Sequence, residues 1–198
     1  MKRGGLIFIG VLVVLIIGVI VSYNSMVGKR NIVEAQWHQV ENQYQRRLDL
    51  IPNLVATVQN VSAFEKSTLE AVMNARASAT QVKIDPSNMD AASLQKFDQA
   101  QTAVSSSLGR LLAVAEAYPD IKSVQNFSDL QTQLEGTENR ISTERGRFND
   151  AVLDYNNSIQ TFPRNLYAGM FGFKEKPYFE AKAGAENPPS VDSLFKKK

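Results

Sequence analysis

Two groups of charged residues lie beside apolar positions and are the strongest candidates for specific chemistry in this sequence. Arginines and carboxylates come close together along predicted helices at Arg46, Arg47, Asp49, Glu138, Arg140 and Arg145. These side chains can lie on solvated helix faces, where ion pairs add little stability. Alternatively, Asp49 or Glu138 pairs with an arginine inside or across a helical bundle, and such buried pairs can fix helix register. The sequence leaves both interpretations open.

Amide and aromatic side chains form a second set of candidates. Asn149 and Asn156 are seven residues apart, so they repeat on one face of a helix, where amides can hydrogen-bond between helices. Near the C-terminus, aromatic rings gather among glycines and lysines at Phe171, Phe173, Tyr178 and Phe179. This aromatic group is expected either to cover one end of a bundle or to form a docking patch for another chain.

The residue types that catalysis and metal binding need are scarce. The chain has no cysteine, and its one histidine is His38. Thiolate chemistry is therefore excluded, and Ser-His-Asp or multi-histidine sites have almost nothing to use. A di-metal bundle needs Glu-x-x-His pairs, and Gly169-x-x-Gly172 is too short for a phosphate-binding loop. We predict no catalytic residue, cofactor, metal or small-molecule substrate, and the net charge of +2 makes no case for nucleic acid.

Helical periodicity is what must position these side chains. Apolar residues recur at spacings of four and three, most regularly at Leu130, Leu134, Thr137, Ile141, Glu144, Phe148, Val152, Tyr155 and Ile159. A similar seam runs through Val33, Trp37, Val40, Tyr44 and Ile51, and Arg47 interrupts it. Half-apolar helices gain stability by packing together. We therefore predict an all-α fold, in which residues 24–180 form a long antiparallel up-and-down bundle of three to four helices.

Prolines and polar segments mark the expected ends of the helices. Pro52 cannot continue a helix undisturbed, so a break or kink is expected at residues 49–53. Residues 83–92 are typical of a loop. Ser128 looks like the start of a capping box that opens the last long helix. Residues 181–198 are predicted to be a disordered basic tail.

Residues 6–23 are predicted to form a transmembrane helix. Every residue from Leu6 to Val21 is apolar or glycine, and about 20 residues cross the ~30 Å hydrocarbon core of a bilayer. A cleaved signal peptide is the alternative, but its apolar run is usually only ~7–15 residues long. Gly10 and Gly18 lie on roughly one face of the span and could assist contacts between helices in the membrane.

Basic residues around the span favour one orientation only slightly. Lys2 and Arg3 lie in the short basic tail of residues 1–5, whereas Lys29 and Arg30 follow the span. The compact basic start favours a cytoplasmic N-terminus, with the bundle on the outer, periplasmic side of a bacterial inner membrane.

The order and spacing of many short segments resemble the LemA family of bacterial membrane proteins. The segments that carry the resemblance are Tyr23-Asn24, Arg30-Asn31, Trp37, RRLDLIPNLV from Arg46, Glu65, ARA from Ala75, AEAYPDIK from Ala115, Leu130-Gln131, Leu134, TENRI from Thr137, FNDAV from Phe148, Tyr155-Asn156 and FPRNLYAGMFGF from Phe162. The resemblance implies an N-terminal anchor and a long antiparallel bundle. It implies no established activity, cofactor or catalytic residue.

Three functional hypotheses follow, in order of preference. The first is a non-catalytic, membrane-anchored scaffold or adaptor of the cell envelope, acting as a homo-oligomer or through other membrane proteins. The second is a membrane-shaping or lipid-sensing protein, because the aromatic and lysine-rich end could engage an anionic bilayer surface. The third and remote alternative is an enzyme, for which Glu65, Asp49 and Glu138 would be the residues to test.

Overall fold

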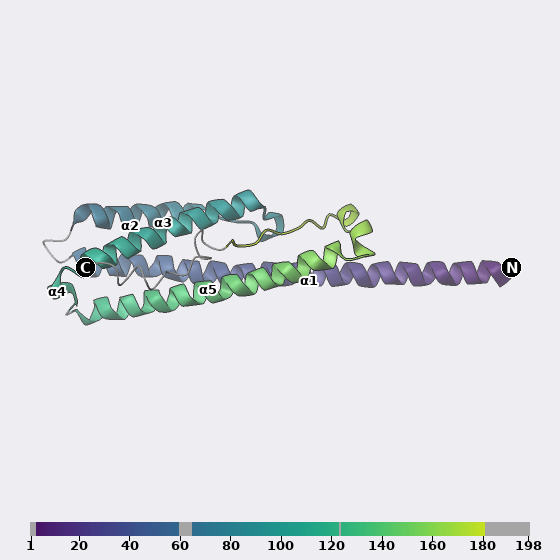
Figure 1. Cartoon of the computed structure of the whole chain (residues 1–198), viewed down its shortest axis with the longest axis horizontal. Helices are drawn as coiled ribbons and strands as arrows, with labels where there is room; N and C mark the ends of the chain where they lie inside the picture. Colours follow the sequence, from purple (N-terminus) through teal and green to yellow (C-terminus); the bar gives the residue numbers. More distant parts are fainter. Residues whose placement is uncertain (1–2, 60–64, 123, 181–198) are drawn as a thin grey trace, which may run out of the picture.

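The computed structural model describes residues 3–59, 65–122 and 124–180 of the chain. The described residues form long helices, a short helical turn and three 3-10 turns, without strands: α1 (Arg3–Gln59), α2 (Lys66–Gln81), η1 (Pro86–Asn88), α3 (Ala91–Ala115), α4 (Pro119–Lys122), α5 (Gln125–Gln160), η2 (Arg164–Leu166) and η3 (Gly169–Phe171). α1 packs antiparallel along α5, and α2 packs antiparallel along α3 (Figure 1). The predicted all-α, up-and-down bundle is confirmed.

α1 passes through Pro52 without ending, so the predicted break at residues 49–53 is wrong as a helix boundary. Proline has no N–H, and the carbonyl of Leu48, four residues earlier, therefore loses its donor within the helix. Arg76 on α2 supplies a replacement, because its Nε donates to the Leu48 carbonyl oxygen at 2.9 Å. A partner from a neighbouring helix thus satisfies the group that the proline leaves unpaired.

The other boundaries fall close to the expected places, with one shift. α2 ends at Gln81 and α3 begins at Ala91, which agrees with a loop at 83–92. A capping box does open a helix, but it opens α3: Ser93 N donates to Asp90 at 2.7 Å, and Asp90 N donates to the Ser93 hydroxyl at 3.1 Å. α5 begins at Gln125, so Ser128 lies inside the helix. This earlier start brings Phe127 into the core.

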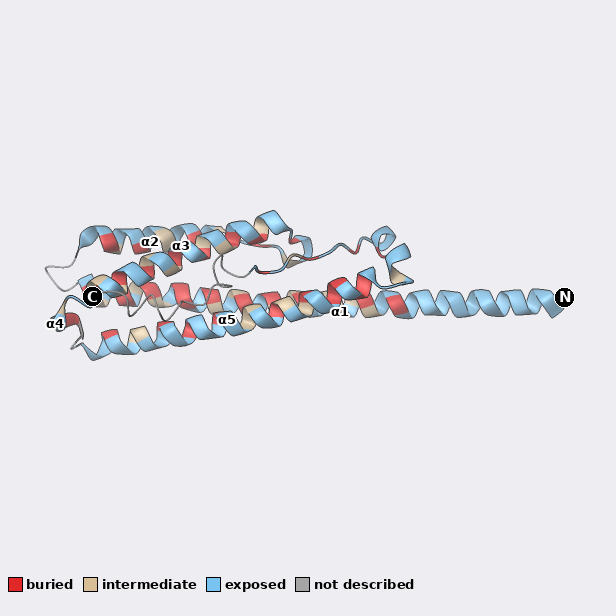
Figure 2. Ribbon diagram, viewed as in Figure 1, coloured by how far each residue is buried: buried red, intermediate tan, exposed pale blue. Residues whose placement is uncertain are grey.

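Buried residues form two hydrophobic clusters that follow one another along the bundle (Figure 2). The cluster nearer the N-terminal span ends on α1 at Tyr44, and the distal cluster begins at Leu48. On α3 the same division falls between Phe97 and Val104. The clusters therefore leave room for a polar layer at one level of the bundle, and the candidate site lies there.

The first part of α1 stands clear of the bundle. The side chains from Leu6 to Val21 are exposed, and burial on α1 begins at Ser22 and Met26 (Figure 2). Within the described part of the chain, α1 is the helix that is long and apolar enough to cross a membrane. The predicted division into residues 6–23 and 24–180 falls inside one continuous helix. Residues 1–2 and the predicted tail at 181–198 lie outside the described residues.

Candidate functional site

Arg47 lies at the centre of the polar layer and joins three helices. It is only 2% exposed. Its Nη1 donates to the Ser105 hydroxyl on α3 at 2.8 Å and to the Glu138 carboxylate on α5 at 2.9 Å. Its Nη2 donates to the side-chain oxygen of Gln101 at 2.7 Å and to the Gln101 carbonyl at 3.1 Å. The fork-shaped guanidinium is suited to this role because its donors point in several fixed directions.

Burial of this charge is costly, and its partners offset the cost only in part. The guanidinium lies 5.1 Å from the centre of the Tyr44 ring, which adds a cation–π contact. Among the residues that the structure describes, the Nε of Arg47 is buried without a hydrogen-bond partner. The side chain of Glu138 is 49% exposed, so this carboxylate keeps much of its hydration. Removing Arg47 would therefore cost more than the ion pair alone contributes.

Arg145 on α5 forms a second node near this layer. Its Nη1 donates to the Asp98 carboxylate on α3 at 2.8 Å and to the Tyr44 hydroxyl on α1 at 3.4 Å. Its Nη2 donates to the Glu180 carbonyl at 3.3 Å, and its guanidinium lies 4.3 Å from the centre of the Phe179 ring. Arg145 thereby ties the C-terminal segment to three helices.

The predicted charged residues divide between the two nodes and the solvated surface. Arg47, Glu138 and Arg145 take part in the two nodes. Arg46 and Arg140 are exposed, and an exposed Asp49 accepts a hydrogen bond from Gln45. The two interpretations that the sequence left open therefore apply to different members of the same group.

Sequence reasoning missed Gln101, Ser105 and Asp98, which complete the nodes. A signal for Gln101 was present in the sequence of α3. Leu94, Phe97, Val104 and Leu108 follow the spacing of threes and fours, and Gln101 occupies the core position between Phe97 and Val104. A polar residue at a core position of one helix can be matched by a polar residue at the same level of another. Gln101 and Arg47 are such a pair.

Two asparagines on α5 hold an extended strap, which we define as residues 173–180. The side chain of Asn156 donates to the Lys176 carbonyl at 2.9 Å and accepts from Lys176 N at 2.9 Å. Asn149 makes the same pair of bonds with Phe179, both at 2.9 Å. Seven helical residues advance about 10.5 Å, and three extended residues advance about 10 Å, so the two repeats match. These amides bind the strap, whereas bonds between helices were expected.

The strap also carries a buried lysine. The ammonium of Lys176 donates to the carbonyl oxygens of Pro86 and Ser87, both at 2.7 Å, and so fixes the strap to the loop that contains η1. Burial lowers the pKa of Lys176 below its ordinary value. The loop between α2 and α3 is therefore held from the opposite end of the chain.

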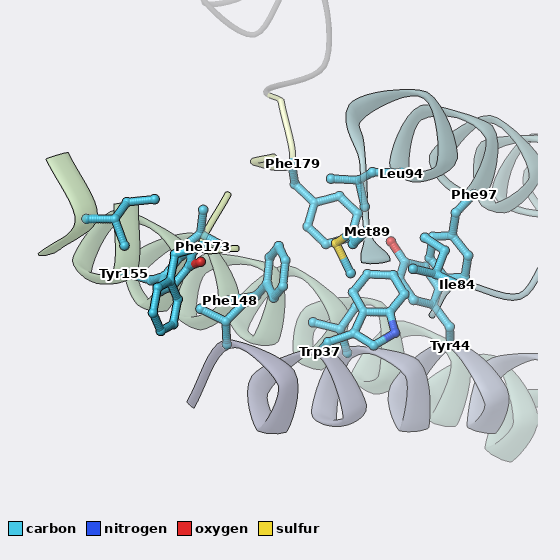
Figure 3. Packing of buried hydrophobic residues seen from close by; sticks show 14 of the residues in the cluster. Trp37, Tyr44, Ile84, Met89, Leu94, Phe97, Phe148, Tyr155, Phe173 and Phe179 are labelled. Carbon is cyan, nitrogen blue, oxygen red and sulfur yellow. The ribbon is translucent and has the colours of Figure 1, made fainter. Parts of the chain in front are cut away.

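The predicted aromatic patch divides into buried and exposed rings. Phe179 stacks on Trp37 at 6.0 Å between ring centroids and contacts Phe148 edge-on at 5.5 Å (Figure 3). Phe173 is likewise buried, and Arg30 lies 5.4 Å above its ring. Phe171 and Tyr178 are exposed. Docking through Phe173 or Phe179 would require the strap to leave the bundle.

The geometry of these contacts supports holding helices together. Within residues 3–59, 65–122 and 124–180, no group of three or more His, Asp or Glu side chains could hold a metal ion. The fold and the site define a class of protein: a helical bundle, carried on an apolar N-terminal helix and tied internally by arginine and asparagine contacts.

The chain belongs to the LemA family, whose sequence profile matches residues 36–193. It is similar to the magnetosome proteins MamQ 1 and MamQ 2 of Paramagnetospirillum magneticum, at 30% identity over 87% of this chain and 70% of each relative. It is also similar to the magnetosome protein MamQ of Magnetospirillum gryphiswaldense, at 27% identity over 93% of this chain and 74% of the relative. Family membership and the apolar helix together support a membrane-associated, non-catalytic role.

Proposed function

We propose that this chain is a scaffold or adaptor of the bacterial cell envelope that acts by self-assembly or by recruiting membrane partners. The continuity of α1 carries this proposal (Figure 1). The helix that exposes residues 6–21 is the same helix that buries Met26, Val33 and Trp37 in the core. A bundle held rigidly at a membrane meets its partners at a raised effective concentration, so weak contacts suffice for assembly.

We place the protein in the inner membrane, with its N-terminus in the cytoplasm and the bundle in the periplasm. The basic residues before the span support this orientation. The chain has no cysteine, so a single cysteine in place of the exposed Asn139 can be labelled selectively. A membrane-impermeant maleimide should label this variant in intact spheroplasts, and labelling only after lysis would reverse the proposed orientation.

Gly10 and Gly18 provide the test of self-assembly. Among the described residues, a Cβ atom at either position meets nothing within 4 Å, so a larger side chain has room there within the monomer. The full-length protein in mild detergent should form discrete oligomers by light scattering. A variant that carries both Gly10→Ile and Gly18→Ile should form smaller oligomers. Gly5→Ile is the matched control, because a Cβ atom at Gly5 also meets nothing within 4 Å among the described residues.

Crosslinking in cells followed by mass spectrometry tests the recruitment of other membrane proteins by this chain. A monodisperse monomer in detergent, together with no crosslinked copy or partner in cells, would remove the scaffold proposal. The second candidate is a lipid-surface role, favoured by the exposed apolar side chains beside the span. It predicts binding to anionic vesicles by the full chain that depends on those side chains and not on oligomer size.

A further inference from the structure

The segment after α5 folds back onto α1 at the level where the apolar span ends. We call residues 161–173 the lobe. Its Tyr167 hydroxyl donates to the Ser22 hydroxyl at 2.7 Å, and Phe171 and Phe173 contact the Tyr23 ring at 5.3 and 5.5 Å between centroids. Ala168, within the lobe, is buried. The lobe is therefore fixed to Ser22 and Tyr23, the two residues that directly follow the apolar run from Leu6 to Val21.

The lobe exposes several large apolar side chains. Phe162 is 75% exposed and Met170 is 85% exposed, and Leu166 and Phe171 of the same lobe are also exposed. These side chains contribute little to the bundle core, so packing within the chain does not explain them. Grouped exposed apolar residues of this kind mark contact sites with proteins or membranes.

Distance along α1 places this surface at the bilayer. Ser22 and Tyr23 come one and two residues after Val21, an axial rise of about 3 Å from the last residue of the apolar run. Interfacial segments commonly sink about 5–10 Å into the boundary between headgroups and acyl chains. A lobe bonded to Ser22 and Tyr23 cannot avoid this zone when residues 6–21 span the membrane.

We propose that the lobe is a second membrane contact, in which Phe162, Leu166 and Met170 enter the leaflet from which α1 emerges. Arg164, between Phe162 and Leu166 in the sequence, and Lys174, just after the lobe, suit anionic headgroups. The lobe would fix the tilt of the bundle through a contact separate from the span. Lipid is the occupant, rather than a second copy, because the bilayer already surrounds the helix to which the lobe is bonded.

Single-cysteine variants of the full-length protein test this contact. Met170→Cys and Leu166→Cys replace exposed side chains, so an NBD fluorophore can be attached without disturbing the core. The proteins are reconstituted in vesicles of phosphatidylcholine and phosphatidylglycerol with or without brominated acyl chains. Val14→Cys in the span and Asn139→Cys on α5 are the membrane-buried and solvent-exposed controls, and far-UV circular dichroism checks the fold.

Quenching by brominated lipid should be at least about threefold stronger at positions 166 and 170 than at 139, as an apolar insertion requires. It should persist at about 0.5 M salt, because the contact is apolar as well as charged. Quenching no greater than at position 139 would overturn the proposal. A second result would also overturn it: blue-shifted NBD emission that brominated lipid does not quench and that disappears when the protein is diluted with empty lipid. That result indicates contact with a second copy of the chain. The comparison of quenching at positions 166 and 170 with quenching at position 139 does not depend on whether the chain self-assembles.

Discussion

At the scale of single residues, Arg47 shows how one charge can specify the pairing of helices. It occupies a position that the apolar seam of α1 assigns to the core, yet every helix it contacts offers oxygen atoms at that level: Ser105 and Gln101 on α3, and Glu138 on α5. A shift of any helix by one residue would break these bonds and leave a buried charge unpaired. Apolar side chains alone would penalise such a shift less.

Replacing Arg47 should therefore destabilise the bundle strongly. We expect Arg47→Ala to lower the free energy of unfolding by about 2–4 kcal/mol, because it leaves a cavity and an unpaired Gln101 oxygen. Arg46→Ala, at the exposed neighbouring position, should change it by less than about 0.5 kcal/mol. Urea unfolding of the full-length protein in detergent, followed by Trp37 fluorescence, measures both. Equal effects of the two variants would contradict the central role of Arg47.

The asparagine contacts give a second prediction at this scale. Asn156→Asp replaces the amide donor that faces the Lys176 carbonyl with an acceptor, in a side chain that is buried. We expect a loss of about 1–3 kcal/mol and faster hydrogen exchange at residues 173–180. Asn139→Asp, an exposed site on the same helix, is the control. Unchanged exchange in the strap would mean that Asn156 does not hold it.

At the scale of elements, the bond between Arg76 and Leu48 explains why α1 tolerates a proline. The bond also joins α1 to α2. α1 packs less extensively against α2 than against α5, so this bond is a notable link between α1 and α2. The proline and the arginine therefore act as one unit, in which Pro52 frees a carbonyl and Arg76 occupies it.

A double-mutant cycle tests this unit. Arg76→Ala should destabilise the natural chain by about 1–2 kcal/mol, since a part-buried carbonyl loses its donor. In a Pro52→Ala background, the new N–H at position 52 can bond to the Leu48 carbonyl. In that background Arg76→Ala should lower the free energy of unfolding by about 0.5–1.5 kcal/mol less than in the natural chain. Urea unfolding of the four proteins gives the coupling energy. Additive effects would show that the two residues act independently.

At the scale of the whole molecule, one helix belongs both to the membrane and to the bundle. We expect the full chain to remain in the membrane pellet after alkaline carbonate extraction, because residues 6–21 anchor it. A chain that begins at Ser22 should move largely to the supernatant, since interfacial contacts by themselves give weak, reversible binding. N-terminal sequencing of the mature protein is the complementary measurement. A mature N-terminus near residue 25 would indicate a cleaved signal peptide.

The sequence by itself determined the helices, the apolar span and the family. Those features depend on local periodicity and composition, and Leu6 to Val21 or the seam on α5 can be recognised without knowing what packs against them. The sequence also indicates that Gln101 lies at a core position, since this polar residue interrupts the apolar seam of α3 as Arg47 interrupts that of α1.

Tertiary structure alone decided which polar residues became partners. Arg46 and Arg47 are adjacent and chemically identical, yet one is exposed and the other is buried. α1 continues through Pro52, and Arg76 on α2 bonds to the Leu48 carbonyl that the proline leaves unpaired. The asparagines of α5 bind a strap whose own sequence carries no strong local signal. The physical reason is that a hydrogen bond depends on where the partner lies in space, and residues 20 to 145 positions apart in sequence meet only after the helices have packed.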